Sequence, residues 1–162
     1  MKNKIIFILF LSFIFCANLF AAENYFSFES KSIEYKDDKD IIIADLPGLI
    51  EGASDGVGLG HKFLAHVERC KLIIHLCDLS CENSLLVKNY KLIRKELEKY
   101  GEITGLKKEI LILNKSDLVD KEETLKKINI LKKLSGSDPI LISCVDNSGI
   151  IKLIEFLYET VK

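Results

Sequence analysis

An unbroken apolar run from Ile41 to Ala44, closed by Asp45, Pro47 and Gly48, most constrains what this 162-residue chain can fold into. A run without a polar face predicts a strand buried on both sides, as in a parallel sheet covered by helices. Proline ends the strand, and glycine lets a backbone N–H approach a ligand closely. A carboxylate at such a strand end lies where open α/β sheets bind ligands. The sequence therefore predicts a phosphate-binding segment at residues 45–48, including Leu46, in which Asp45 holds Mg²⁺ through water. The alternative is a plain strand end and turn.

A second apolar strand, Glu109 to Leu113, runs directly into Asn114, Lys115, Ser116 and Asp117. Asn-Lys-x-Asp after a buried strand resembles the guanine-reading motif of GTP-binding proteins. In that motif the aspartate accepts two hydrogen bonds from guanine, the lysine stem packs on the ring, and the asparagine ties neighbouring loops together. A polar turn that caps the next helix is the alternative, and the aspartate-proline-glycine segment upstream argues against it.

The segment from Asp45 to Cys70, DLPGLIEGASDGVGLGHKFLAHVERC, resembles the switch region of the Obg family of ribosome-associated bacterial GTPases. The resemblance extends from about Tyr35 to the C-terminus, and the run from Gly52 to His61 is its most diagnostic part. It implies a Ras-like P-loop NTPase fold, an α/β three-layer sandwich that binds GTP or GDP with Mg²⁺. It also implies a cytoplasmic protein that associates with the large ribosomal subunit. Leu49 stands where many GTPases carry a water-orienting glutamine, which implies slow hydrolysis.

The resemblance adds a third binding segment, Ser143, Cys144 and Val145, after the predicted strand 140–142. In GTPases a serine-alanine pair at this place offers backbone N–H groups to guanine O6. Here Cys144 replaces the alanine, and its side chain is small enough to preserve such a contact. The expected ligand set therefore consists of residues 45–48, 114–117 and 143–145, and no catalytic residue is assigned.

The upstream parts that the family implies are not found in the sequence. No glycine precedes Gly48, so no glycine-rich phosphate loop is present before it. We therefore expect a fold that is incomplete at its N-terminal side and lacks the first strand, the phosphate loop and the first helix. Because the phosphate loop neutralises the β- and γ-phosphates, we expect little or no GTP hydrolysis by this chain alone.

Residues 1–22 differ in composition from the rest, with Lys2 and Lys4 followed by a long apolar stretch and a small-residue end. This pattern predicts a secretory signal peptide, and a membrane anchor is an alternative. A third interpretation is unrelated sequence joined to a truncated G domain, which conflicts least with a cytoplasmic family. The expected organisation is a leader at 1–22, a linker at 23–32 and an incomplete G domain at 33–162.

The remaining periodicity predicts a strand at 72–79 and helices at 61–70, 83–100, 122–134 and after Gly149. Asn83 is expected to cap its helix. The lysines at 126, 127, 132 and 133 look like one solvated helix face. In the last helix, seven apolar residues are expected to face the sheet, namely Ile150, Ile151, Leu153, Ile154, Phe156, Leu157 and Val161. A net charge of −1 argues against direct DNA binding. Two functions remain open: a guanine-nucleotide-binding protein, or a non-enzymatic remnant that is exported or membrane-anchored.

Overall fold

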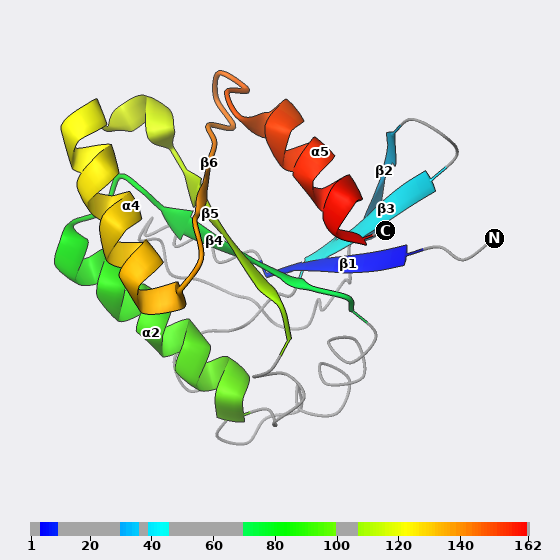
Figure 1. The fold of residues 1–162 in the computed structure, drawn as a ribbon, viewed down its shortest axis with the longest axis horizontal. Coiled ribbons are helices and arrows are strands. Elements are labelled where there is room, and N and C mark those ends of the chain that lie inside the picture. Colours follow the sequence, from blue (N-terminus) through cyan, green and yellow to red (C-terminus); the bar gives the residue numbers. More distant parts are fainter. Residues whose placement is uncertain (1–3, 10–29, 36–38, 46–69, 100–106, 162) are drawn as a thin grey trace, which may run out of the picture.

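The computed structural model describes residues 4–9, 30–35, 39–45, 70–99 and 107–161. Over these ranges the chain forms a six-stranded sheet with helices on both faces (Figure 1). The strands are β1 (Lys4–Leu9), β2 (Ser30–Tyr35), β3 (Lys39–Asp45), β4 (Ile73–Asp78), β5 (Glu109–Asn114) and β6 (Ile140–Leu141). The helices are α2 (Asn83–Lys99), the short 3₁₀ helix η1 (Ser116–Leu118), α4 (Lys121–Ser135) and α5 (Ile150–Val161).

The strand order is β2-β3-β1-β4-β5-β6. β2 pairs antiparallel with β3 at the edge, and the other pairs are parallel. This α/β architecture agrees with the predicted fold class.

The N-terminal apolar stretch supplies a strand. β1 lies between β3 and β4, with Lys4 opposite Ile41 and Phe7 opposite Ile73. The expectation that the chain lacks the central first strand is therefore wrong. The physical reason is that a lysine followed by apolar residues describes a buried parallel strand as well as the start of a leader, and only the neighbouring strands distinguish the two. Residues 10–22 of the predicted leader lie outside the described ranges.

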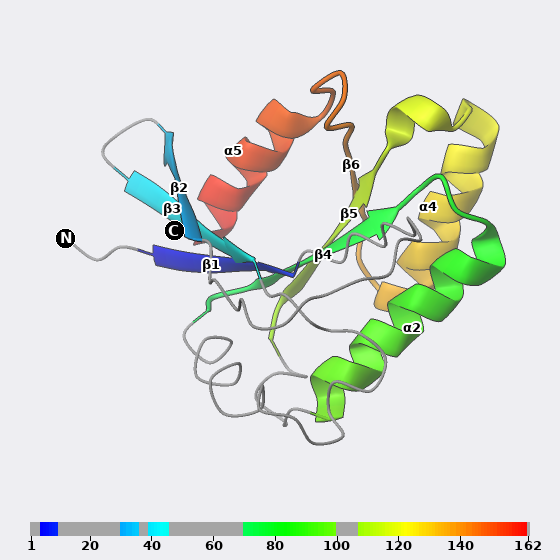
Figure 2. The same ribbon diagram turned by 180° about the vertical axis from the view of Figure 1, so that it is seen from behind.

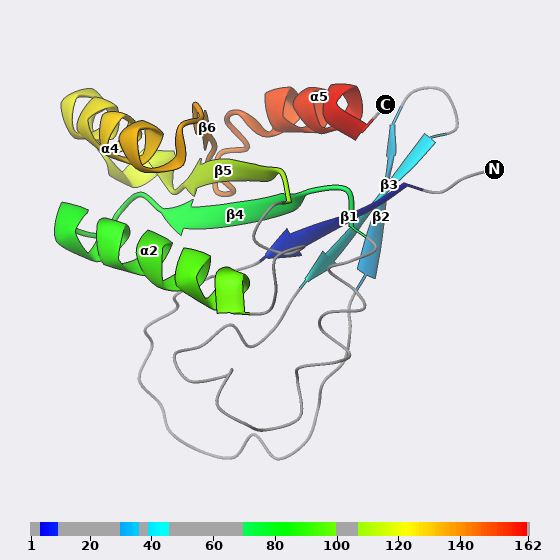
Figure 3. The same cartoon turned by 60° about the horizontal axis from the view of Figure 1, so that its bottom comes forward.

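The core has two halves, one on each face of the sheet. On one face, side chains from β4 and β5 pack with Leu157 of α5, in a cluster that includes Leu72, Ile74, Ile110 and Ile112. On the other face, Leu111 and Leu113 pack with Leu86 and Tyr90 of α2 and Leu131 of α4. Figure 3 shows α2 and α5 on opposite sides of the sheet, and Figures 1 and 2 show α2 beside α4. These two helices therefore form one layer, with the sheet and α5 as the second and third.

The helix ends follow local chemistry. The Asp120 side chain accepts a hydrogen bond from the Glu123 N–H at the start of α4, and Gly136, with φ of 74°, ends that helix by donating to the Lys132 carbonyl. Asn83 does not cap α2, contrary to expectation, because it is the first helical residue and the Glu82 carbonyl accepts from Leu86 N–H. The buried Oδ1 of Asn83 has no hydrogen-bond partner among the described residues.

Two expectations about helix faces are also wrong. In α5, Leu157 is buried, but Ile151 and Phe156 are exposed, because seven apolar residues in twelve positions exceed what one sheet-facing stripe can cover. In α4, Lys127 is only 4% exposed, although its neighbours Lys126, Lys132 and Lys133 are solvated as expected.

No helix within the described ranges has the length and apolarity that crossing a membrane requires. Several predicted segments lie outside the described ranges: the diagnostic run from Gly52 to His61, the residues Leu46, Pro47 and Gly48, and all but the last residue of the predicted helix at 61–70.

Candidate functional site

The carboxyl ends of β4, β5 and β6 bring three loops together. Asp78 and Asn114 are register partners at the ends of β4 and β5. Backbone hydrogen bonds join the loops beyond the strands: Leu79 N–H donates to the Asn114 carbonyl at 3.0 Å, and Ser116 N–H to the Ile142 carbonyl at 3.2 Å. The residues predicted at 114–117 and 143–145 therefore meet at one edge of the sheet, where parallel α/β sheets bind ligands.

Asn114 links two of these loops through its side chain. Its Oδ1 accepts a hydrogen bond from the Cys144 backbone N–H at 3.2 Å. This contact has the loop-tying role that the resemblance implies for the asparagine. It places the backbone of residues 143–145 against the end of β5, with the side chains of Cys144 and Val145 exposed.

Lys115 has a left-handed backbone with φ of 67° and precedes η1. Its Nζ donates to Asp78 Oδ2 at 2.6 Å. The other carboxylate oxygen, Oδ1, accepts from both the N–H and the hydroxyl of Ser80. Burial raises the pKa of Asp78, but the hydrogen bonds from Lys115 and Ser80 outweigh it and hold the pKa below its usual value. The ammonium of Lys115 is thus anchored to β4.

Asp78 is a further residue of the candidate site that the sequence patterns do not identify. It lies 37 positions before its lysine partner, and no local pattern connects the two. The signal that could have found it is positional, because it is the last residue of β4, next to the strand that delivers Asn114.

Asp117 lies in η1 with an exposed side chain. Its Oδ1 accepts a hydrogen bond from the Ser143 hydroxyl at 2.6 Å. Ser143 is fully buried, and its Oγ in turn accepts from the backbone N–H groups of Val145 and Asp146 at 3.2 and 3.4 Å. One buried hydroxyl therefore orients the carboxylate of Asp117 and organises the following turn.

The turn from Ser143 to Gly149 closes on itself. Ser143 N–H donates to the Ser148 carbonyl at 3.0 Å, and Asn147 and Gly149 have φ of 62° and 73°. Ser148 N–H donates to Asp146 Oδ1 at 2.8 Å, and the hydrogen bonds from Ser148 lower the pKa of Asp146. The positive φ values make a compact loop that presents the backbone of residues 143–145 toward Asn114.

The upstream half of the predicted site is only partly within the described residues. Asp45 ends β3, which runs parallel to β1 and therefore to β4; its register partner Ile8 in β1 pairs in turn with Ile74, four residues before Asp78. The geometry thus fits a base-reading site of carboxylate and backbone N–H groups. The assignment of Asp45 as the Mg²⁺ ligand remains a prediction.

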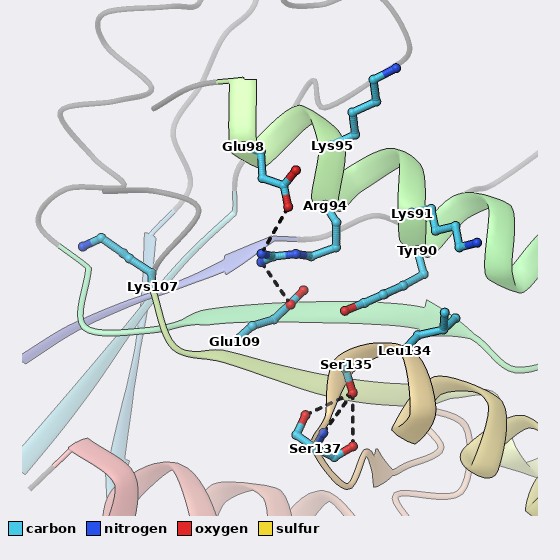
Figure 4. A pocket seen from close by; sticks show the side chains of 10 residues that line it. All are labelled: Tyr90, Lys91, Arg94, Lys95, Glu98, Lys107, Glu109, Leu134, Ser135 and Ser137. Carbon is cyan, nitrogen blue, oxygen red and sulfur yellow. Dashed lines mark hydrogen bonds and ion pairs between the residues drawn. The ribbon is translucent and has the colours of Figure 1, made fainter. Parts of the chain in front are cut away.

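A cleft lies at the opposite end of β5. It has a volume of about 560 Å³ and is lined by α2, the segment around Ser137 and Glu109 (Figure 4). Arg94 donates to Glu109 Oε2 at 3.2 Å, and Glu109 Oε1 contacts Nδ1 of the buried His75 at 2.7 Å. In Figure 4 the side chains of Lys91 and Lys95 extend away from the cleft. This paired cluster joins α2 to the sheet and is separate from the candidate site.

The family model described as 50S ribosome-binding GTPase matches residues 26–115, more than half of the chain, from before β2 through Lys115. The chain belongs to this GTPase family. Its relatives by sequence include GTPase Obg of Rickettsia bellii, 45% identical over 130 residues, and GTPase Obg of Rickettsia massiliae, 42% identical over 155 residues. These alignments cover 80% and 94% of this chain but 39% and 46% of the relatives, so the chain spans less than half of their length.

Solved structures of two other proteins share the fold. Era, in a complex with MgGDPNP and part of 16S ribosomal RNA, superposes with a TM-score of 0.63 over 83% of this chain and 44% of its own, at 18% identity. The FeoB G-domain of Methanococcus jannaschii superposes with a TM-score of 0.61 over 99% of both chains, at 21% identity. At such identities the likeness shows the fold, and it agrees with the Ras-like prediction.

Proposed function

We propose that this chain binds GDP and GTP by reading guanine at the loops that follow β4, β5 and β6. The observation that carries the proposal is the contact of Ser143 Oγ with Asp117 Oδ1 at 2.6 Å, because it joins the two predicted guanine-reading segments in one site. The family assignment and the Obg relatives support it.

Base selectivity follows from the chemistry of Asp117. A carboxylate accepts hydrogen bonds only, and guanine offers a ring N–H and an exocyclic amine together. Adenine offers no such pair of donors, so a bound adenine leaves the carboxylate without its partners. An unmatched group of this kind costs about 1–3 kcal/mol, which corresponds to about 5–150-fold in affinity. Because Asp117 is exposed to water, we expect the lower half of that range.

We propose further that the chain alone hydrolyses GTP slowly or not at all. In Ras-like proteins the phosphate loop follows the first strand, and its glycines and lysine hold the β- and γ-phosphates. Residues 10–29, which follow β1, contain no glycine, lysine or arginine. Leu49, which follows the aspartate-proline-glycine segment, cannot orient a water molecule. Binding therefore rests on the base site, with Asp45 as the proposed contact to Mg²⁺.

The test is calorimetric titration of the full chain with GDP, GTP and ADP, with and without Mg²⁺. We expect micromolar binding of both guanine nucleotides, weaker binding of ADP and only a small effect of Mg²⁺. Asp117→Ala should abolish the selectivity. Asp120 lies three residues after Asp117, and Asp120→Asn preserves the cap of α4, so this variant should keep the wild-type selectivity. A folded chain that binds no nucleotide would reject the proposal and favour the non-enzymatic remnant.

We propose the large ribosomal subunit as the partner and the cytoplasm as the compartment, on the strength of the family description. The use of residues 4–9 as the central strand supports retention of the N-terminal segment, since its removal would take β1 out of the sheet. Co-sedimentation of the chain with isolated large subunits, with small subunits as the control, tests the partner. A fusion of residues 1–30 to a reporter that is active only after export tests the compartment.

A further inference from the structure

Lys127 of α4 is a buried cation at the back of the proposed site. Its side chain is 4% exposed. Its Nζ donates to the backbone carbonyls of Leu79 and Cys81, each at 2.8 Å, and lies 3.7 Å from Glu123 Oε1. A buried ammonium is unfavourable unless it is paired and hydrogen-bonded, so this lysine has a strong preference for the observed position. The loop after β4 is therefore fixed to α4 by one side chain.

That loop is the support of Asp78. Ser80, between the two carbonyls that Lys127 holds, donates twice to Asp78 Oδ1, and Cys81 Sγ donates to the Asp78 carbonyl at 3.1 Å. The second carboxylate oxygen of Asp78 holds the Lys115 ammonium at 2.6 Å. A chain of contacts thus runs from Lys127 through the loop and Asp78 to Lys115.

We infer that Lys127 is a positioning residue for base recognition, which orients Lys115 through the loop 79–81 and Asp78. This inference rests on the proposed nucleotide function for its consequence but not for its geometry. Lys127 does not contact the ligand. It fixes the loop so that Asp78 holds the ammonium of Lys115 and leaves the stem of that lysine in place for the guanine ring.

The test compares Lys127→Met, which keeps an unbranched apolar stem and removes the ammonium donors, with Lys126→Met. Lys126 is the adjacent residue in α4, is exposed and pairs with Glu122, so it is the matched control. We expect Lys127→Met to weaken GDP binding by about 5–30-fold and Lys126→Met to leave it within about twofold. Urea unfolding of each variant gives the folded fraction under the binding conditions.

The Asp78→Ala background distinguishes the positioning role of Lys127 from a purely structural role. If Lys127 acts through Asp78, Lys127→Met should change GDP affinity by less than about twofold once Asp78 is absent, because the effect has no route to Lys115. Additive losses in the double variant would overturn the inference.

A second readout needs no nucleotide. The carboxyl carbon of Asp78, titrated by NMR, should show a higher pKa in Lys127→Met than in the wild type, because the pair with Lys115 loosens; Lys126→Met should show no rise. An unchanged Asp78 pKa would overturn the inference even if the chain bound no GDP, whereas a raised pKa without GDP binding would reject only the nucleotide function. If Lys127→Met does not fold, Lys127→Gln, which keeps an N–H donor, should give a smaller rise of the same sign.

Discussion

Gly149 and Gly136 form a matched pair that tests how the loop after β6 is built. Both have a left-handed backbone, with φ of 73° and 74°. A Cβ added at Gly136 meets no atom of the described residues within 4 Å, whereas one added at Gly149 lies 2.2 Å from the Leu141 carbonyl oxygen. The two alanine substitutions therefore share the cost of the backbone conformation and differ in the steric clash.

The shared cost is modest. A non-glycine residue in the left-handed region loses about 1–2 kcal/mol, and the stiffer unfolded chain offsets about 0.4–1 kcal/mol of it. We expect Gly136→Ala to reduce the free energy of unfolding by about 1 kcal/mol. At Gly149 the contact must open from 2.2 Å to at least 3.0 Å, which forces β6 and the start of α5 apart. Such overpacking adds about 1–3 kcal/mol, so we expect a loss of about 2–4 kcal/mol for Gly149→Ala.

Urea unfolding followed by circular dichroism measures both losses, and the difference between the variants isolates the clash. Gly149→Ala should also weaken GDP binding in the folded protein, because Ser143 N–H is held by the carbonyl of Ser148, the residue before Gly149. Gly136→Ala, at the far end of α4, should not. Equal losses of stability in the two variants would refute the packing described for the loop.

Three further predictions concern the same region. Ser143→Ala should lower the free energy of unfolding by about 1.5–2 kcal/mol, because it removes a hydrogen bond to a charged, water-exposed carboxylate, and it should also weaken GDP binding. Chemical unfolding measures the first effect and calorimetry the second, and unchanged values of both would contradict the role of the hydroxyl. The free energy of unfolding of the wild type should exceed that of Asp78→Asn above pH 3.8, and this difference should shrink as the pH falls through the lowered pKa of Asp78. Unfolding at several pH values measures the difference, and a difference that grew on acidification would contradict the lowered pKa. At pH 8 an alkylating reagent should modify the exposed Cys144 and spare Cys77, because burial, with Glu109 and Cys81, raises the pKa of the Cys77 thiol to about 12. Mass spectrometry of the digested protein shows which cysteine is modified first, and faster modification of Cys77 would contradict the prediction.

The sequence predicts the parts of this fold whose signal is local. Apolar runs in the sequence coincide with β3, β4 and β5, and the motif from Asn114 to Asp117 follows its strand directly. The central strand β1 is not predictable in this way, because its apolar residues fit a leader equally well. Pairing with Ile41 and Ile73, remote in sequence, decides between the two, and no window of residues 1–22 contains that information.

The site shows the same division. Asn114, Lys115 and Asp117 are recognisable by type and spacing, but Asp78 and Lys127 gain their roles from contacts across 37 and 48 positions. Lys127 stands beside Lys126 in a lysine-rich helix, and helical periodicity alone does not identify the position that turns toward the loop after β4. A tertiary contact overrides the expectation that lysines are solvated.

The most direct test of guanine reading exchanges the base preference. Asp117→Asn replaces one acceptor oxygen with an NH₂ donor, while its remaining oxygen can still accept from Ser143 Oγ. Xanthine carries a carbonyl where guanine carries its amine, so we predict that the variant binds XDP more tightly than GDP, with the wild type showing the reverse order. A variant that retains the wild-type preference for GDP over XDP would contradict the assignment of Asp117 and with it the proposed site.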